Sequence, residues 1–242
     1  MSLVTAKNAV LFDLGGTLAR YYDRSEWPGV LEQAISQVHD YLRGQGLLRR
    51  SVAEVWRGVR DENYESRNHR VRPLEKRLVR IFRLDDSPRS DDLVAEMCRR
   101  FMKPIFALGA CYDDALPVLQ ELRSKGFKTA IVSNTPWGSP DRVWREEIRR
   151  LGLHECVDAV VFCRDAGWRK PARPIFDYAL NKLQVSPQDC IFVGDDPRWD
   201  LAGPIRVGMA AILVDRRGTM LDYEGESIEN LCELSARLEL LG

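Results

Sequence analysis

The sequence has no surplus of either charge, because 36 lysine and arginine residues are matched by 36 aspartate and glutamate residues. A balanced chain creates no overall field that attracts nucleic acid or an anionic membrane surface. The sequence also lacks an apolar run near the roughly 20 residues of a membrane span, and its start lacks a secretory signal pattern. These absences predict a cytoplasmic protein without nucleic acid or membrane partners.

Cysteine and histidine patterns that bind metals are missing as well. The six cysteines include no Cys-x-x-Cys pair, and several lie in apolar runs such as VVFC and CIFV. The three histidines share no ligand spacing. The sequence therefore predicts reduced cysteines in the core rather than disulfides or a zinc site.

Short apolar runs and helical patterns are abundant in a chain of 242 residues, which is long enough to bury a substantial core. Helical patterns separate the later apolar runs, and this alternation predicts an α/β fold with a mostly parallel sheet. The predicted strands cover residues 9–12, 129–132, 159–162, 191–193 and 211–214.

Residues 19–110 differ from the rest of the chain. They contain about four helical segments and no convincing strand. An insertion of this length after the first strand predicts a second, helical domain. The predicted division is a core of residues 1–18 and 111–242 and a helical domain of residues 19–110.

Polar residues follow several of the predicted strands, at the sheet edge where open α/β folds bind their ligands. Each of them alone has a structural explanation, such as a helix cap, a turn or a surface charge. Their coincidence at one edge favours a functional site. The residues concerned are Asp13, Ser133, Asn134, Lys170, Asp195 and Asp200.

In order and spacing these stretches resemble the four motifs of the haloacid dehalogenase superfamily of aspartate-nucleophile hydrolases, and the resemblance covers nearly the whole chain. FDLGGT resembles motif one with Asp13 as nucleophile, and IVSNT resembles motif two with Ser133. KPARPIF resembles motif three with Lys170, and VGDDPRWD resembles motif four with Asp195 and Asp200. The resemblance implies a Rossmann-like core and an α-helical cap formed by residues 19–110.

The resemblance also implies a metal site and a mechanism. Asp13 would attack phosphorus and form an aspartyl-phosphate that water then hydrolyses. Oxygen ligands at a phosphoryl site suit Mg²⁺, which Asp13, the Gly15 carbonyl and Asp195 would hold. Asp200 is assigned to the same site and is expected to orient metal-bound water rather than to bind the ion directly.

The remaining site residues are expected to bind the phosphoryl group of a small anionic substrate. Gly15 and Gly16 would offer backbone amides, and Ser133 with Asn134 would offer hydrogen bonds. Lys170 would pair with both the nucleophile and the transferring group. The sequence identifies neither the substrate nor an oligomeric state.

Motif one departs from the phosphatase pattern, because Gly15 stands where those enzymes carry a second aspartate that acts as general acid and base. Three alternatives follow: a phosphatase of good leaving groups or with another acid, a hydrolase of a phosphonate or carbon–halogen bond, and a phosphate-binding protein. The acids of VGDD favour metal-dependent phosphoryl chemistry. A phosphonate hydrolase would need a lysine in the cap, where Lys76 and Lys103 stand without a supporting pattern.

The insertion is rich in basic residues between positions 67 and 83. Apolar residues at helical spacing there predict an amphipathic helix whose charges face solvent; charges facing the cleft would favour an anionic metabolite. Three tryptophans beside the motifs, Trp137, Trp168 and Trp199, are predicted to pack against the sheet edge rather than to line the site.

Overall fold

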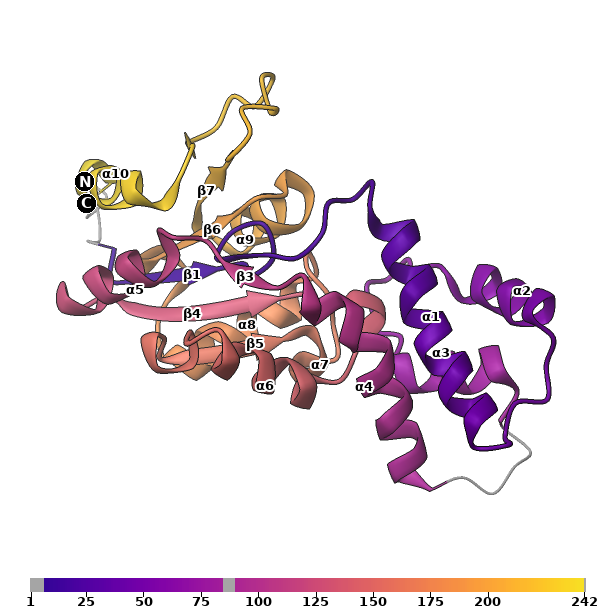
Figure 1. Ribbon diagram of the computed structural model, residues 1–242. Coiled ribbons are helices and arrows are strands. Elements are labelled where there is room, and N and C mark those ends of the chain that lie inside the picture. The colour runs from indigo at the N-terminus through magenta and orange to yellow at the C-terminus, as the bar shows by residue number, and fades with distance from the viewer. Residues whose placement is uncertain (1–6, 85–89, 242) are drawn as a thin grey trace.

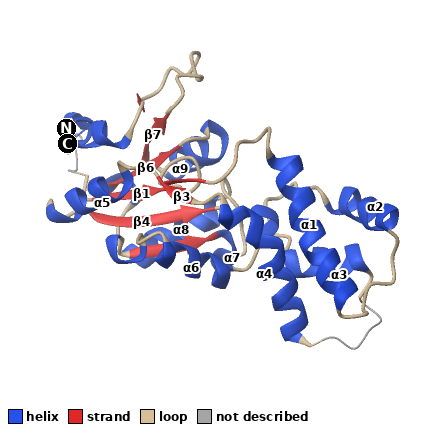
Figure 2. Ribbon diagram, in the orientation of Figure 1, coloured by secondary structure: helices blue, strands red, loops and turns tan. Residues whose placement is uncertain are grey.

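The computed structural model describes residues 7–84 and 90–241, and its centre is a six-stranded sheet (Figures 1 and 2). Every neighbouring pair of strands is parallel, in the order β5-β4-β1-β6-β7-β8. The predicted α/β class and the five predicted strands are confirmed, and β8 is an addition. The strands are β1 (Ala9–Phe12), β4 (Lys128–Ser133), β5 (Ala159–Phe162), β6 (Cys190–Gly194), β7 (Ala210–Val214) and β8 (Ser227–Ile228).

Alternate residues of a strand point to opposite sides of the sheet, so both faces carry apolar side chains, and helices cover both. In β1, Val10 and Phe12 belong to one buried cluster, whereas Ala9 and Leu11 belong to the other. The short α7 (Cys163–Ala166) follows β5. The first cluster includes α5 (Ala115–Ser124), α6 (Asp141–Arg150) and α10 (Leu234–Leu241), and the second includes α8 (Arg173–Leu183) and α9 (Ala202–Val207).

A group of four helices lies beside the sheet (Figure 1). Residues 19–110 were predicted to lack strands, and this is wrong at both ends, where β2 (Ala19–Arg20) pairs antiparallel with β3 (Ala110–Cys111). A two-residue strand is too short to leave a periodic signal. The four helices are α1 (Trp27–Gly44), α2 (Val52–Glu62), α3 (Leu74–Phe82) and α4 (Asp91–Ala107).

Local sequence explains where two of these helices begin. Ser51 and Glu54 form a capping box at the start of α2, in which the Glu54 carboxylate accepts the Ser51 N–H at 2.9 Å. Ser90 caps α4 by accepting the Leu93 N–H at 3.1 Å. The amphipathic helix predicted from the basic segment is α3, whose buried residues include Leu74 and Leu78.

Two further expectations concern covalent and membrane chemistry. All six cysteines are free, as predicted, but the expectation that they lie in the core holds fully for only three, because Cys111 and Cys156 are half-buried and Cys232 is exposed. Within residues 7–84 and 90–241, no helix is both long and apolar enough to cross a bilayer.

Candidate active site

The carboxyl ends of three neighbouring strands carry polar residues predicted for the site. β1 lies between β4 and β6, and the ends of the three strands are in register. Asp13 follows β1, Ser133 ends β4, and Asp195 follows β6. Because parallel strands point the same way, the sheet brings these three residues to a single edge.

Lys170 places its ammonium group between two carboxylates at this edge. Its Nζ donates to Asp13 Oδ1 at 2.5 Å and lies 2.6 Å from Asp200 Oδ1. Lys170, Asp13 and Asp200 are respectively 1%, 8% and 2% exposed. A buried charge is costly unless it is paired, so these contacts hold Lys170 in its charged form and raise its pKa to about 12 despite the opposing effect of burial.

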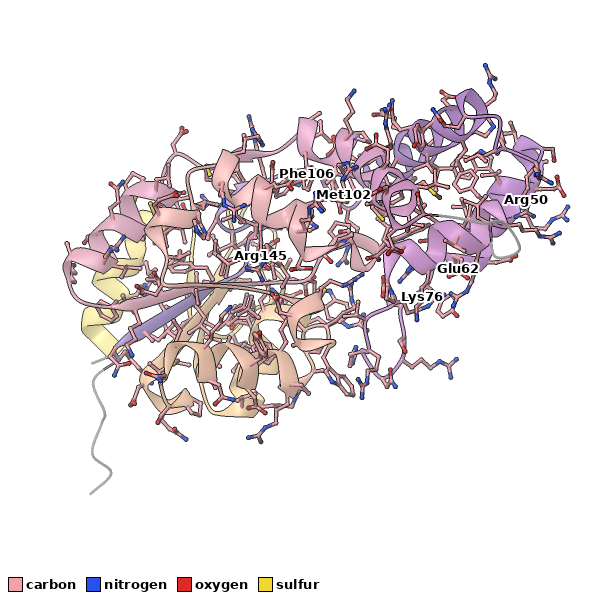
Figure 3. The ribbon with its side chains drawn as sticks, turned by 90° about the horizontal axis from the view of Figure 1, so that it is seen from below. Arg50, Glu62, Lys76, Met102, Phe106 and Arg145 are labelled. Carbon is pink, nitrogen blue, oxygen red and sulfur yellow. The ribbon has the colours of Figure 1, made fainter. Side chains whose placement is uncertain are left out.

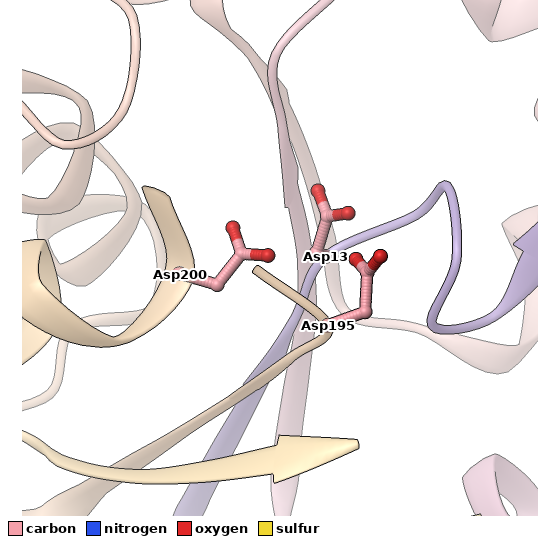
Figure 4. A group of neighbouring side chains, drawn as sticks. All are labelled: Asp13, Asp195 and Asp200. Atoms are coloured by element: carbon pink, nitrogen blue, oxygen red, sulfur yellow. The ribbon is translucent and has the colours of Figure 1, made fainter. Parts of the chain in front are cut away.

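Three carboxylates converge here: Asp13 follows β1, Asp195 follows β6, and Asp200 comes from the helical turn Pro197–Leu201 just beyond Asp195 (Figure 4). Each offers one oxygen, and these oxygens all lie within 4.8 Å of one another. Burial, followed by repulsion from Asp13 and Asp200, raises the pKa of Asp195 to about 8. Burial also raises the pKa of Asp200, against the lowering effect of Lys170.

The crowding of these carboxylates provides a test of whether a metal ion fits. Lys170 pairs with Asp13 and Asp200, and Asp195 has no ion pair within residues 7–84 and 90–241, so negative charge remains uncompensated when all three carboxyl groups are ionised. The donors are oxygen atoms alone, which suits a hard divalent cation better than zinc. The three residues could therefore hold a metal ion.

Two glycines make room for the carboxylates. Gly16 has a φ of +86°, and a Cβ at this residue would lie 2.2 Å from Asp195 Oδ2. A Cβ at Gly194 would lie 2.3 Å from Asp200 Cβ. Side chains at these positions would displace the carboxylates, which explains why glycine occupies both.

The main chain of Lys170 is fixed from the end of β4. The Lys170 N–H donates to Asn134 Oδ1 at 2.8 Å, and Asn134 Nδ2 donates to the Lys170 carbonyl at 3.3 Å. On the other side of the loop, the Arg169 N–H donates to the His69 carbonyl at 2.8 Å. The Asn134 side chain, predicted to bind substrate, is thus engaged in holding Lys170.

Two hydroxyl groups lie at this edge of the sheet, Ser133 at the end of β4 and Thr17 in the loop after β1. Ser133 is 5% exposed, and its Oγ donates to the carbonyl of Asn134 at 3.2 Å. Thr17 is fully buried, and its Oγ1 has no hydrogen-bond partner in the part of the chain that the structure describes. Thr17 was not among the predicted site residues, although it is the last residue of FDLGGT.

The structure accommodates a side chain at Gly15. Of the two glycines after Asp13, only Gly16 has a positive φ. A Cβ at Gly15 would meet Tyr21 Cδ2 at 3.7 Å, an ordinary van der Waals contact. The Tyr21 ring packs edge-on against Trp144, and burial followed by repulsion from Glu147 raises the pKa of its phenol, which stays protonated at neutral pH.

A buried arginine connects the helical segment of residues 19–110 to the loop before Lys170. Arg77 was predicted to face solvent, and this is wrong, because it is fully buried on α3. Its guanidinium donates to the Glu62 carbonyl at 2.7 Å and to Glu65 Oε1 at 2.9 Å, which satisfies the buried charge. Glu65 Oε2 also lies 3.7 Å from Arg169 Nε. Sequence periodicity could not reveal this contact between distant segments.

The three tryptophans have different surroundings. Trp137 is 4% exposed, so it is packed as predicted, but the ring it stacks on is Phe101 of α4, with centroids 5.5 Å apart, rather than a residue of the sheet. Trp168 and Trp199 are only half-buried. The Arg70 guanidinium lies 4.1 Å from the Trp168 ring, and the Arg198 guanidinium lies 4.4 Å from the Trp199 ring. Each of these two indole rings therefore contacts one arginine beside the loops of the site.

A parallel α/β sheet with clustered carboxylates and a paired lysine at its carboxyl edge is the arrangement of a hydrolytic enzyme site. A family model described as haloacid dehalogenase-like hydrolase matches residues 7–208, and the chain belongs to this family of hydrolases.

Named relatives and a solved structure agree with this assignment. Glyceraldehyde 3-phosphate phosphatase of Methanopyrus kandleri is 32% identical, over 89% of this chain and 87% of the relative. Ribulose-1,5-bisphosphate 5-phosphatase of Halopiger xanaduensis is 28% identical, over 86% and 84%. A 2-haloacid dehalogenase structure from Pseudomonas syringae pv. Tomato DC3000 has a TM-score of 0.69 at 24% identity, over 98% of this chain and 100% of that one, and shows the shared fold.

Proposed function

We propose that this hydrolase is a Mg²⁺-dependent phosphatase of a small, anionic phosphorylated metabolite and that it acts through an aspartyl-phosphate on Asp13. The observation that carries the proposal is the cluster of three carboxylates with one lysine at the edge of the sheet. Similarity to glyceraldehyde 3-phosphate phosphatase supports phosphate ester chemistry.

Asp13 is the nucleophile in this proposal. Its Oδ1 accepts the hydrogen bond of Lys170, and this contact holds the ammonium group beside the place where a phosphoryl group would sit. Bound Mg²⁺ would neutralise charge on the phosphoryl oxygens, and Asp13, Asp195 and the Gly15 carbonyl would hold it. Asp200 pairs with Lys170, and this contact fixes the ammonium group from the opposite side.

The phosphoryl oxygens need donors in addition to the lysine. The Ser133 hydroxyl and the backbone N–H groups of Gly15 and Asn134 are proposed to supply them. The Gly16 N–H was predicted to do the same, and this is wrong, because it donates to the Ala19 carbonyl at 2.8 Å. Ser133 donates to a backbone carbonyl over 3.2 Å, a long contact that a substrate oxygen can replace.

We further propose that residues 19–110 form a cap over a core of residues 1–18 and 111–242. Its contacts with the core support this division: Arg164 donates to both Glu75 carboxylate oxygens, at 2.7 and 2.9 Å. Arg70 and Arg198 have no carboxylate within 4 Å among residues 7–84 and 90–241. Cations without acidic partners favour a substrate with more than one negative charge.

The alternative chemistries fit the site less well. A phosphonate hydrolase would need a cap lysine at the nucleophile, but Lys76 lines a separate cavity to which none of the predicted site residues contributes. Cleavage of a carbon–halogen bond needs no metal, so it would not explain three crowded carboxylates. Catalytic turnover would distinguish any of these hydrolases from a protein that only binds phosphate.

The test compares two neighbouring aspartates with a panel of phosphate monoesters, phosphonates and haloacids. Asp195→Asn should lose most Mg²⁺ affinity and most phosphatase activity. Asp196→Asn is the matched control, because Asp196 caps the following turn by accepting the N–H groups of Arg198 and Trp199, a role that asparagine can fill. Full activity in chelator, or turnover of haloacids alone, would contradict the proposal.

A further inference from the structure

A second cavity, of about 560 Å³, lies between the helical segment and the core. Its walls come from α3, α4 and the beginning of α6, and the proposed catalytic residues take no part in them. This volume is in the range of pockets that hold small organic ligands. Any molecule bound here would touch both the proposed cap and the core.

The walls of this cavity combine apolar and cationic side chains. Val79 of α3, Val94 and Ala95 of α4, and Val143 of α6 provide apolar surface. The charged wall residues are four cations and two acids: Lys76, Arg80, Arg99, Arg142, Glu75 and Asp91. The cavity therefore carries more positive than negative groups around an apolar surface.

Most of these charged groups already have partners. Glu75 is held by both terminal nitrogens of Arg164, so this acid is not available to neutralise a cation in the cavity. Arg99 pairs with Glu96 at 2.8 Å, and other wall arginines have acidic partners too. Lys76 lies on α3 and is nearer to the core than Arg50, which precedes α2 (Figure 3). Lys76 has no ion pair in the described segments.

We propose that this cavity is an effector site for an amphipathic anion, with an apolar body against the valines and an anionic group near Lys76. Among the described residues of the walls, Lys76 offers the unpaired positive charge that an anion needs, and the apolar surface disfavours a small hydrated ion such as free phosphate as a ligand. Because the walls belong to α3, α4 and α6, the bound anion stabilises the contact between the cap and the core. This site is independent of the phosphatase proposal, which concerns other residues.

The two lysines of residues 19–110 provide a matched pair for the test. Lys76 lines the cavity, whereas Lys103 is exposed on α4 and is not part of its walls. Replacing either residue by glutamate changes the net charge of the protein equally. Fluorescence titration of the full chain with anilinonaphthalene sulfonate, an aromatic anion, measures the affinity directly, with phenylnaphthylamine as the uncharged probe.

We expect Lys76→Glu to weaken sulfonate binding by about threefold to tenfold, the range expected for reversing one exposed charge at a binding site. Lys76→Met should give a smaller loss, Lys103→Glu should bind like the wild type, and the uncharged probe should bind more weakly than the sulfonate. Saturating sulfonate should also raise the thermal midpoint of the wild type. Equal sulfonate affinity for Lys76→Glu and Lys103→Glu, or equal affinity of the two probes, would overturn the proposal.

Discussion

Replacing Gly15 by aspartate should increase phosphatase activity, because it restores the acid that motif one lacks. A positioned general acid contributes about 10²- to 10⁴-fold to a rate, which corresponds to roughly 3 to 5 kcal/mol of barrier. The gain should approach this range for alkyl phosphates, whose leaving groups need a proton. It should be small for aryl or acyl phosphates, which leave readily as anions.

The structure indicates that the Gly15→Asp variant will fold. Gly15 does not have a positive φ, and the nearest atom to its added Cβ would be Tyr21 Cδ2 at 3.7 Å. Less freedom in the unfolded chain adds about 0.4 to 1 kcal/mol of stability at a compatible position.

The assay measures kcat/KM for a series of phosphate monoesters and plots its logarithm against the pKa of the leaving group. The wild type should show a steep decline with increasing pKa, and Gly15→Asp should flatten it. Gly15→Asn is the control, because it has nearly the same shape without a carboxyl proton. A flat wild-type plot, or equal changes in both variants, would refute the idea that a missing acid limits this enzyme.

Three further predictions concern the charges of the site. Lys170→Met should lower the free energy of unfolding by about 3 to 5 kcal/mol, because it leaves buried carboxylates without their cation. Urea unfolding in the presence of a chelator measures this loss, and a loss below about 1 kcal/mol would contradict the burial argument. The raised pKa of Asp195, about 8, means that the folded state keeps a proton that the unfolded state loses near pH 4, so the stability of the metal-free protein should fall between pH 4 and 8. Over the same interval Mg²⁺ affinity should rise by at most about tenfold per pH unit, because binding displaces that proton, and calorimetry showing pH-independent affinity would contradict this.

The sheet and the edge that carries the site could be predicted from the sequence because both depend on local patterns. Apolar runs of three or four residues identified five strands, and polar residues immediately after them identified the edge. The parallel order then brought Asp13 and Asp195 together without further information. In contrast, β2 and β3 are two residues long and depend on pairing between segments far apart in the chain.

Contacts of the helical segment were the least predictable part. The helical pattern of α3 gave the buried leucines correctly but assigned all charges to solvent, because periodicity does not show that Glu65 approaches Arg77. The sequence also did not reveal that the Asn134 side chain forms hydrogen bonds with Lys170. Its partner, the main chain of Lys170, comes from a loop whose position depends on the folded sheet.

Rapid quenching followed by mass spectrometry of the peptide that contains Asp13 detects the proposed aspartyl-phosphate itself. During turnover of an aryl phosphate with Mg²⁺, this peptide should gain the mass of one phosphoryl group on Asp13, and the modification should disappear when substrate is exhausted. Asp13→Asn should fold, show no turnover and acquire no phosphoryl group. Undiminished hydrolysis by Asp13→Asn, or a phosphoryl group on another residue during turnover, would contradict the account.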